Sequence, residues 1–268
     1  PSCEYSAQPP VYCPKCASPG LRYLGSGTQR LEAEVKIKFP EARLLRMDSD
    51  TMKAPGSHDA ALEQFRQGKI DILLGTQMIA KGLDFPNVIL VGVIDADTLL
   101  HQPDLRSPER TFQLISQVAG RTGRGEREGR VLVQTMSPDE PVIRFAAAHD
   151  YEKFARYELK NRQILHAPPF STMARIILRS LDEKTVQEES RRIAAILREA
   201  SARTGSDARI LGPAPAILTR LRKFFRYHIQ LTSPTHAQLH ALWREATHRL
   251  DVHPDVELTI DVDPLDMR

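Results

Sequence analysis

The stretch NVILVGVID, residues 87–95, is almost wholly apolar. A run of this kind is typical of a strand that is buried on both faces of a parallel sheet. Around it, from Leu21 to about Thr135, short apolar runs alternate with amphipathic stretches. Strands that alternate with helices predict a parallel sheet flanked by helices, so this part of the chain is expected to be an α/β unit.

Outward from this strand, the same alternation places the other elements of the unit. Further strands are predicted at RYLG (22–25), ARLLRMD (42–48), DILLGT (71–76) and RVLVQT (130–135). Helices are predicted over 28–39, 59–66 and 108–118, and a long polar helix is expected over 138–166.

After HAPPF (166–170), whose consecutive prolines exclude helix, the order of elements changes. A strand over 173–179, a helix, a short strand at 210–211, the strand RYHIQLT (226–232), a second helix and the strand VELTIDV (256–262) are predicted in turn. On RYHIQLT, the residues Tyr227, Ile229 and Leu231 should face the core, and Arg226, His228 and Gln230 the other side. The order βαββαβ predicts a ferredoxin-like α+β domain.

Composition fits a globular protein that works inside a cell. The 268 residues are 41% hydrophobic and 26% charged, with a net charge of +3, which is only weakly indicative of a nucleic-acid partner. There is no long apolar run and no secretory signal, so no membrane association is expected. Three cysteines clustered near the start favour metal or redox chemistry in a reducing cytoplasm. A chain that begins at Pro1 is expected to be a fragment.

The stretch QVAGRTGRG, residues 117–125, is the most informative for function. Arg121 and Arg124 are three residues apart, so near a helix end they point to the same side. Two guanidinium groups aimed at one place suit a triphosphate, and the neighbouring glycines let the backbone approach a ligand. The plain alternative is a solvated loop with two arginines.

This stretch resembles the sixth motif of superfamily 2 helicases, Q-x-x-G-R-x-G-R. The resemblance implies a RecA-like second lobe, with Arg124 as the arginine finger of an ATP site shared between two lobes and with Arg121 and Gln117 beside it. GTQMIAKGLDFPNV (75–88) resembles the fifth motif and GSGTQRLE (25–32) fits the fourth. These imply nucleic-acid contacts at Gly27, Thr28, Thr76 and Gln77, and nucleotide contacts at Gly82, Asp84 and Gly120. Asp84 is alternatively a turn-capping carboxylate.

Several longer strings resemble the PriA family of primosomal replication-restart helicases across almost the whole chain. They are RMDSDT (46–51), DADTLLHQPDLRSPER (95–110), HAPPF, ILGPAPA (210–216) and DVDP (261–264). The resemblance implies three parts: a zinc-binding segment over 1–20, the helicase lobe over 21–165 and a family-specific C-terminal domain over 166–268. It also implies a nucleoid-associated bacterial 3′-to-5′ DNA helicase that recognises stalled or abandoned forks and initiates primosome assembly with primosome proteins.

Neither a phosphate-binding G-x-x-x-x-G-K-[ST] loop nor an Asp-Glu-x-His motif for Mg²⁺ is present in the sequence. Both belong to the first lobe of such helicases, so the chain is expected to carry half of a site for ATP with Mg²⁺ and to hydrolyse no ATP alone. Two alternatives stay open: another superfamily 2 translocase, and a non-catalytic DNA-binding scaffold.

Cys13 and Cys16 form C-P-K-C, which has the spacing of a zinc knuckle, and Cys3 precedes them. The PriA family carries paired knuckles of this kind, so the resemblance implies a Cys₄ zinc site to which this chain contributes three ligands. A redox pair is the alternative, although a redox C-x-x-C is expected at a helix start, and Pro19 and Gly20 follow here instead.

The stretch from Ala208 to Arg244 contains no carboxylate, and LRKFFRYH (221–228) interleaves cations with aromatic residues. This pattern suits single-stranded nucleic acid, and equally an acidic peptide that ends in an aromatic residue. A sheet edge protected by charge is the plain alternative. The PriA resemblance implies that the domain binds DNA and the C-terminal tail of single-stranded DNA-binding protein, with Arg222, Phe224 and Arg226 as candidate anchors.

Overall fold

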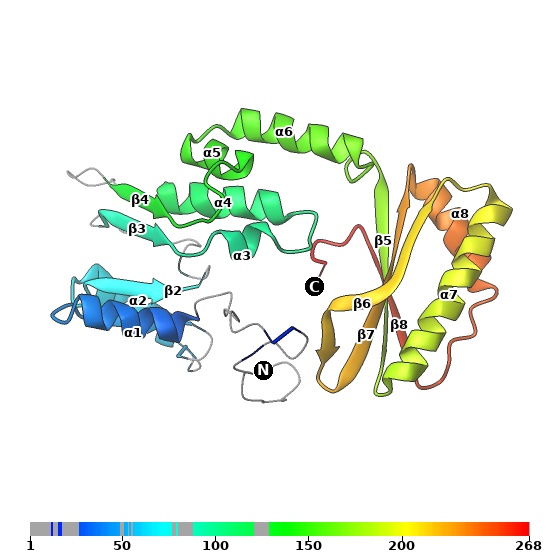
Figure 1. Ribbon diagram of the computed structural model, residues 1–268, viewed down its shortest axis with the longest axis horizontal. Helices are drawn as coiled ribbons and strands as arrows, with labels where there is room; N and C mark the ends of the chain where they lie inside the picture. The colour runs from blue at the N-terminus through cyan, green and yellow to red at the C-terminus, as the bar shows by residue number, and fades with distance from the viewer. Residues whose placement is uncertain are drawn as a thin grey trace. The chain divides into compact units, whose positions relative to one another are not determined.

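The computed structural model describes residues 12, 16–17, 27–48, 51–52, 54, 56–76, 79, 88–120 and 129–267 (Figure 1). The chain divides into two compact units. Of the described residues, those within 10–102 and 106–154 form the N-terminal unit, and those within 103–105 and 155–267 form the C-terminal unit. In the described part of the chain, no helix has the length and apolar character needed to cross a membrane.

The N-terminal unit alternates strands and helices, as the sequence predicts. In chain order its elements are α1 (Thr28–Lys38), β1 (Leu44–Met47), α2 (Ser57–Arg66), β2 (Ile72–Gly75), β3 (Leu90–Val93), α3 (Asp97–Leu100), α4 (Ser107–Ala119), β4 (Arg130–Val133) and α5 (Pro141–Ala147). β1 pairs with β2, and β3 with β4, in each case parallel. The parallel pairing is confirmed, but the described strands form two separate two-stranded sheets. The strand predicted at 22–25 lies outside the described residues.

The expectation that the strand 87–95 is buried on both faces is wrong. α4 and α5 pack against one side of the β3–β4 pair, where Val93 joins a core with Phe112, Ile115 and Val142. Leu90, on the opposite side, is 56% exposed. Because side chains alternate along a strand, a helix on one side buries only every second residue. No other described element covers the side that carries Leu90.

The single long helix expected over 138–166 is in fact two helices, α5 and α6 (Tyr151–Ile164). Between them His149 has a φ of 54°, a left-handed conformation that no α-helix continues through. The Asp150 carboxylate then accepts a hydrogen bond from Lys153 N at 3.0 Å, which caps the start of α6. A capping aspartate in the middle of the stretch therefore marks the break.

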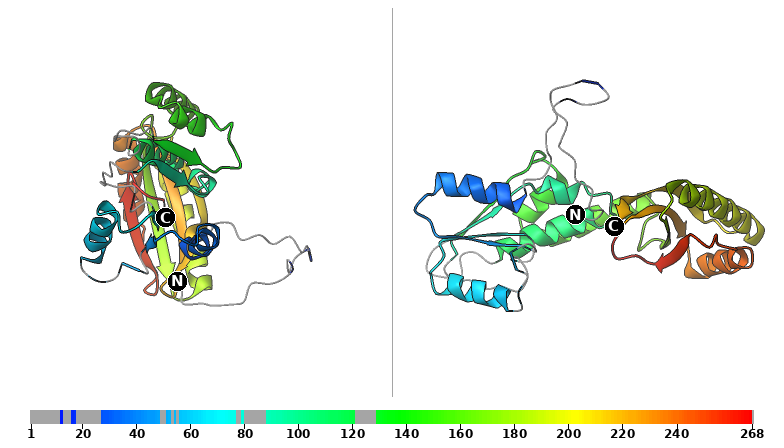
Figure 2. Two further views of the ribbon diagram at one scale, coloured as in Figure 1. Left: turned by 90° about the vertical axis from the view of Figure 1, so that its left-hand side faces the viewer. Right: turned by 90° about the horizontal axis from the view of Figure 1, so that it is seen from below.

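The C-terminal unit has the predicted order of strands and helices: β5 (Thr172–Ser180), α7 (Glu183–Thr204), β6 (Arg209–Leu221), β7 (Phe224–Ser233), α8 (His236–Thr247) and β8 (Glu257–Val262). Its antiparallel sheet has the order β6-β7-β5-β8, and α7 and α8 cover the same face (Figures 1 and 2). The core lies between this face and the helices, and it includes Tyr227, Ile229 and Leu231 as predicted.

The short strand expected at 210–211 is part of a much longer one, since β6 continues to Leu221. Pro213 and Pro215 disfavour a continuous strand, because proline has no backbone N–H to donate to a sheet. β6 accommodates them with two register shifts against β7, between Leu211 and Ala214 and between Pro215 and Arg220. Bulges of this kind let an edge strand continue past residues that a regular ladder excludes.

Candidate functional site

Seven of the residues singled out from the sequence lie outside the described residues: Cys3, Cys13, Gln77, Gly82, Asp84, Arg121 and Arg124. The structure therefore leaves their predicted roles as predictions. It places the other nine, which are Cys16, Gly27, Thr28, Thr76, Gln117, Gly120, Arg222, Phe224 and Arg226.

Three of the predicted nucleic-acid contacts lie near one edge of the β1–β2 pair. Because the strands are parallel with Met47 opposite Gly75, the residues that follow them, Asp48 and Thr76, leave the sheet side by side. Thr28, at the start of α1, donates a 2.6 Å hydrogen bond from its hydroxyl to the Asp48 carboxylate. That bond holds the start of α1 against the end of β1, close to Thr76.

Asp48 is the centre of this edge, and the sequence prediction missed it. It is 4% exposed and accepts hydrogen bonds from Thr28 and from Thr51 N, the latter at 3.0 Å. Arg46 lies 3.1 Å from Asp48 and 3.0 Å from Glu32, so one guanidinium holds β1 and α1 together. The string RMDSDT contained these residues, but their pairing with α1 spans some twenty positions of chain.

Because the Thr28 hydroxyl donates to Asp48, the groups that α1 offers to a ligand are its backbone amides. Gly27 is the N-cap, no side chain among the described residues caps the helix, and the first turn carries no acidic residue. A helix start with these properties is suited to a phosphate. Thr28 thus serves this edge by fixing the helix, and the backbone is the candidate phosphate donor.

Gly75 lets the two strands come this close. A Cβ atom at Gly75 would lie 2.5 Å from the Met47 carbonyl oxygen and 2.9 Å from Ile79 Cγ2. Only glycine fits there without moving backbone, and the exposed Thr76 follows directly. Gly75, which directly precedes the threonine of the predicted fifth motif, therefore sets the position of Thr76.

α4 ends directly before the segment of the sequence that contains the paired arginines. Its buried face includes Phe112, Ile115 and Val118, which anchor it on the β3–β4 pair. Gln117 is exposed in the last turn, and Gly120 is the C-cap residue. A well-anchored helix therefore ends immediately before residues 121–128.

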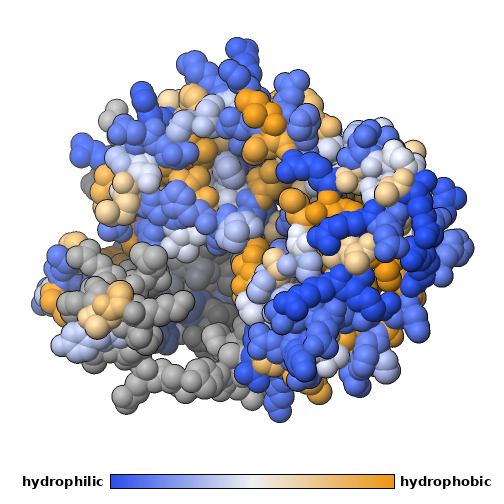
Figure 3. Space-filling model, turned by 45° about the vertical axis from the view of Figure 1, so that its right-hand side comes forward, coloured by the Kyte–Doolittle hydropathy of each residue, from blue (hydrophilic) through white to orange (hydrophobic). Residues whose placement is uncertain are grey.

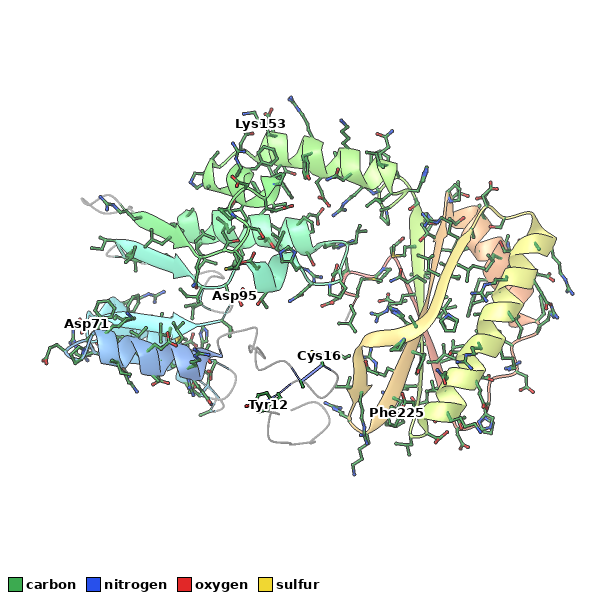
Figure 4. The ribbon with its side chains drawn as sticks, viewed as in Figure 1. Tyr12, Cys16, Asp71, Asp95, Lys153 and Phe225 are labelled. Carbon is green, nitrogen blue, oxygen red and sulfur yellow. The ribbon has the colours of Figure 1, made fainter. Side chains whose placement is uncertain are left out.

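Asp97 joins the carboxyl ends of β3 and β4, and the sequence prediction did not assign it a role. Its carboxylate accepts hydrogen bonds from Thr135 Oγ1 at 3.0 Å and Met136 N at 2.8 Å. Burial opposes ionisation, but these hydrogen bonds outweigh it, so the pKa of Asp97 is lowered. The carboxylate fixes the loop after β4 to the start of α3 (Asp95 beside it is labelled in Figure 4).

The predicted docking strand in the C-terminal unit is less open than expected. Arg226 lies on the sheet face opposite the core, as predicted, but it is only 8% exposed and its Nη1 lies 3.4 Å from the Leu218 carbonyl oxygen. Burial, and then repulsion from Arg179, lower its pKa. Arg226 is buried because β6 continues to Leu221 instead of ending near Leu211. Phe224 is half-buried, and Arg222 is the exposed member of the three.

Cys16 is exposed and carries a free thiol. Within the described residues there is no group of three or more His, Cys, Asp or Glu side chains that could hold a metal ion. The predicted zinc site therefore rests on the spacing of the cysteines alone.

Two family models match the chain, one in each half. The helicase conserved C-terminal domain matches residues 24–126, which includes the β1–β2 edge and the end of α4. The primosomal protein N C-terminal domain matches residues 163–265. Fold, site and matches together define the C-terminal lobe of a helicase joined to a primosomal C-terminal domain.

Curated relatives cover nearly all of this chain. The replication restart protein PriA of Bacillus subtilis is 42% identical over 98% of this chain and 32% of its own length. PriA of Synechocystis is 40% identical over 98% of this chain and 31% of its own length. PriA of Treponema pallidum is 38% identical over 99% of this chain and 40% of its own length. The chain thus spans about a third of the length of the first relatives, and it belongs to the PriA family.

Proposed function

We propose that this chain is the second lobe and C-terminal domain of an ATP-dependent 3′-to-5′ DNA helicase that recognises stalled or abandoned forks and initiates primosome assembly. The observation that carries the proposal is the β1–β2 edge, where Gly75 sets Thr76 beside Asp48 and Asp48 holds the start of α1. The Thr76 hydroxyl and the start of α1 lie at one edge, and together they suit two phosphates of a nucleic-acid strand. The similarity to replication restart proteins supports DNA and primosome proteins as partners.

In this proposal ATP with Mg²⁺ is bound between this lobe and a first lobe that supplies the phosphate loop. Arg124 is the arginine finger, and Arg121, Gln117, Gly120, Gly82 and Asp84 lie around the nucleotide. The ATP supplies the free energy for translocation. This chain's own contribution is cationic charge at the γ-phosphate and contacts to the DNA backbone. Gln117 and Gly120 support this, because a firmly anchored helix holds them next to the arginine segment.

Steady-state ATP hydrolysis with single-stranded DNA tests the proposal. The 268-residue chain alone should show no turnover. In a full-length family member that contains this chain, Arg124→Ala should lower kcat about 10³-fold with little loss of ATP affinity. Arg191→Ala, an exposed arginine on α7, is the matched control and should leave kcat unchanged. A full-length protein with no ATPase activity would favour the non-catalytic scaffold instead.

Zinc stays a proposal for Cys3, Cys13 and Cys16, and the fit is incomplete because a structural zinc site usually takes four ligands. The exposed, free thiol of Cys16 is compatible with such a role. Metal analysis of this chain and of full-length protein should show stoichiometric zinc in the longer protein and less here. If full-length protein purified without chelator contained no zinc, the alternative interpretation of Cys13 and Cys16 as a redox pair would be favoured.

The C-terminal tail of single-stranded DNA-binding protein also stays a proposed partner of the C-terminal unit. Of the three anchors predicted for it, Arg226 is buried and Phe224 is half-buried, so strand β7 is not proposed as the docking site of the tail.

A further inference from the structure

The turn between β6 and β7 has an unusual composition for its geometry. Leu221 pairs with Phe224, which leaves Arg222 and Lys223 as a two-residue turn. Their φ angles are 49° and 75°, so the backbone of both residues is in the left-handed region. Turns of this kind favour Asn-Gly, because a Cβ atom is unfavourable in the left-handed region. Strained backbone of this kind clusters at functional sites.

The side chains at this turn gather positive charge. Arg220, Arg222 and Lys223 are exposed, and none of the three has a carboxylate partner among the described residues. Arg179, on the neighbouring strand β5, is opposite Arg226 and forms an ion pair with Glu257 at 2.6 Å. We call Arg179, Arg220, Arg222 and Lys223 the hairpin tip. The surface of the C-terminal unit that comes forward in Figure 3 is largely hydrophilic.

Each aromatic ring at the tip is half-buried and has a guanidinium over it. The guanidinium carbon of Arg179 lies 4.8 Å from the centre of the Phe224 ring, and that of Arg220 lies 4.9 Å from the centre of the Phe225 ring (Phe225 is labelled in Figure 4). Cation–π contacts of this kind occupy the faces on which a base would stack. A ligand at the tip would therefore contact the edges of the arginine guanidinium groups and the Lys223 ammonium group.

We propose that the hairpin tip binds the phosphodiester backbone of nucleic acid, and that it recognises charge without contacting bases. Arg220, Arg222 and Lys223, the three members of the tip without an acidic partner among the described residues, release counterions when they meet a row of phosphates, which favours binding to any sequence. An acidic peptide with a terminal aromatic residue would need an open apolar surface, and here both rings are half-buried and each has a guanidinium against it. The inference rests on the proposed function in that it takes DNA as the ligand.

One double variant separates the role in binding from the role in folding. Arg222→Asn/Lys223→Gly removes two charges and supplies the residues that the turn geometry prefers. We expect thermal stability equal to or above that of the parent. DNA binding, followed by fluorescence anisotropy without ATP, should weaken about tenfold at low salt, and the log–log salt slope on duplex DNA should fall by about 2. The control variant Lys160→Ala/Arg191→Ala loses the same charge from exposed helix positions. It should change neither the DNA affinity nor the salt slope.

Three comparisons decide the mode of binding. A single strand of abasic nucleotides should lose as much affinity in the double variant as an ordinary strand of equal length. A smaller loss on the abasic strand would overturn a contact to the backbone alone. Arg220→Gln, outside the turn, should also weaken binding; unchanged or tighter binding would indicate that uncovering Phe225 creates a base contact.

The third comparison uses an acidic peptide ending in phenylalanine. If the double variant binds DNA like the parent but loses the peptide, the tip is a protein-docking site and the inference is wrong. Because these measurements need no ATP, they can fail while the ATPase prediction for Arg124 succeeds, and the reverse also holds.

Discussion

Replacing Gly75 by alanine is the sharpest test of how the β1–β2 edge is built. The new Cβ atom would lie 2.5 Å from the Met47 carbonyl oxygen, whereas ordinary contact begins near 3.4 Å. The strands would have to separate by about 0.9 Å, which breaks the nearest ladder hydrogen bond, since one lengthened beyond about 3.5 Å is no longer a hydrogen bond. Overpacking and the lost bond together should destabilise the N-terminal unit by about 3 kcal/mol.

At roughly 3 °C per kcal/mol for a unit of this size, the melting temperature should fall by about 9 °C. Differential scanning calorimetry measures it, and urea unfolding checks the free energy. Gly92→Ala is the matched control, because among the described residues a Cβ atom there would meet only Ile94 Cδ1, at 3.8 Å. It should change stability by less than about 0.5 kcal/mol. Equal melting temperatures for Gly75→Ala and Gly92→Ala would refute the close approach of β1 and β2.

Three further predictions concern the helices. Glu158→Ala should cost about 3 kcal/mol in urea unfolding, because it leaves the buried Arg162 without the carboxylate that lies 2.8 Å away; a cost below about 1 kcal/mol would contradict this. The pKa of Glu189 is lowered, chiefly by the hydrogen bond from Arg192, so its stabilising contribution is present above its ordinary pKa of 4.5 and is lost as pH falls below that value. The free energy of unfolding, measured between pH 3 and 7, should therefore depend less on pH in Glu189→Gln than in the parent. If the two proteins showed the same pH dependence, the result would count against the ion pair. Gly205→Ala, at a C-cap with φ of 60°, should lower stability by about 1 kcal/mol in thermal unfolding, and an unchanged melting temperature would argue against the left-handed cap.

Local pattern was enough to predict much of the C-terminal unit. Tyr227, Ile229 and Leu231 face the core because a strand alternates with a period of two, and that period is visible in the sequence. The same rule placed Arg226 on the opposite face, yet it gave no information on how deeply that face is covered. Arg226 is buried because β6 runs past two prolines to Leu221, and the bulges that permit this have no simple sequence signal.

The β1–β2 edge shows a second limit. Thr76 was singled out from the sequence, because the residue types and spacing that follow it match a helicase motif, but the close approach of strands that requires Gly75 was not. The contact between Thr28 and Asp48 was not predicted either, since a hydrogen bond between residues twenty positions apart depends on how α1 packs on β1. Asp97 and Thr135, thirty-eight positions apart, are a similar case. Spacing predicts what one segment does, and packing decides which segments share a site.

The arrangement of the C-terminal sheet sets when this unit can form during synthesis. β5, a central strand, pairs on one side with β8, the last strand of the chain, and Arg179 meets Glu257 seventy-eight residues later. At translation rates of about 5 to 20 residues per second, roughly 4 to 16 s pass between the appearance of those two residues. Until then one edge of β5 has no partner, and an open strand edge can pair with other chains. The exposed edge is therefore a hazard of the growing chain, and its duration is set by the speed of the ribosome.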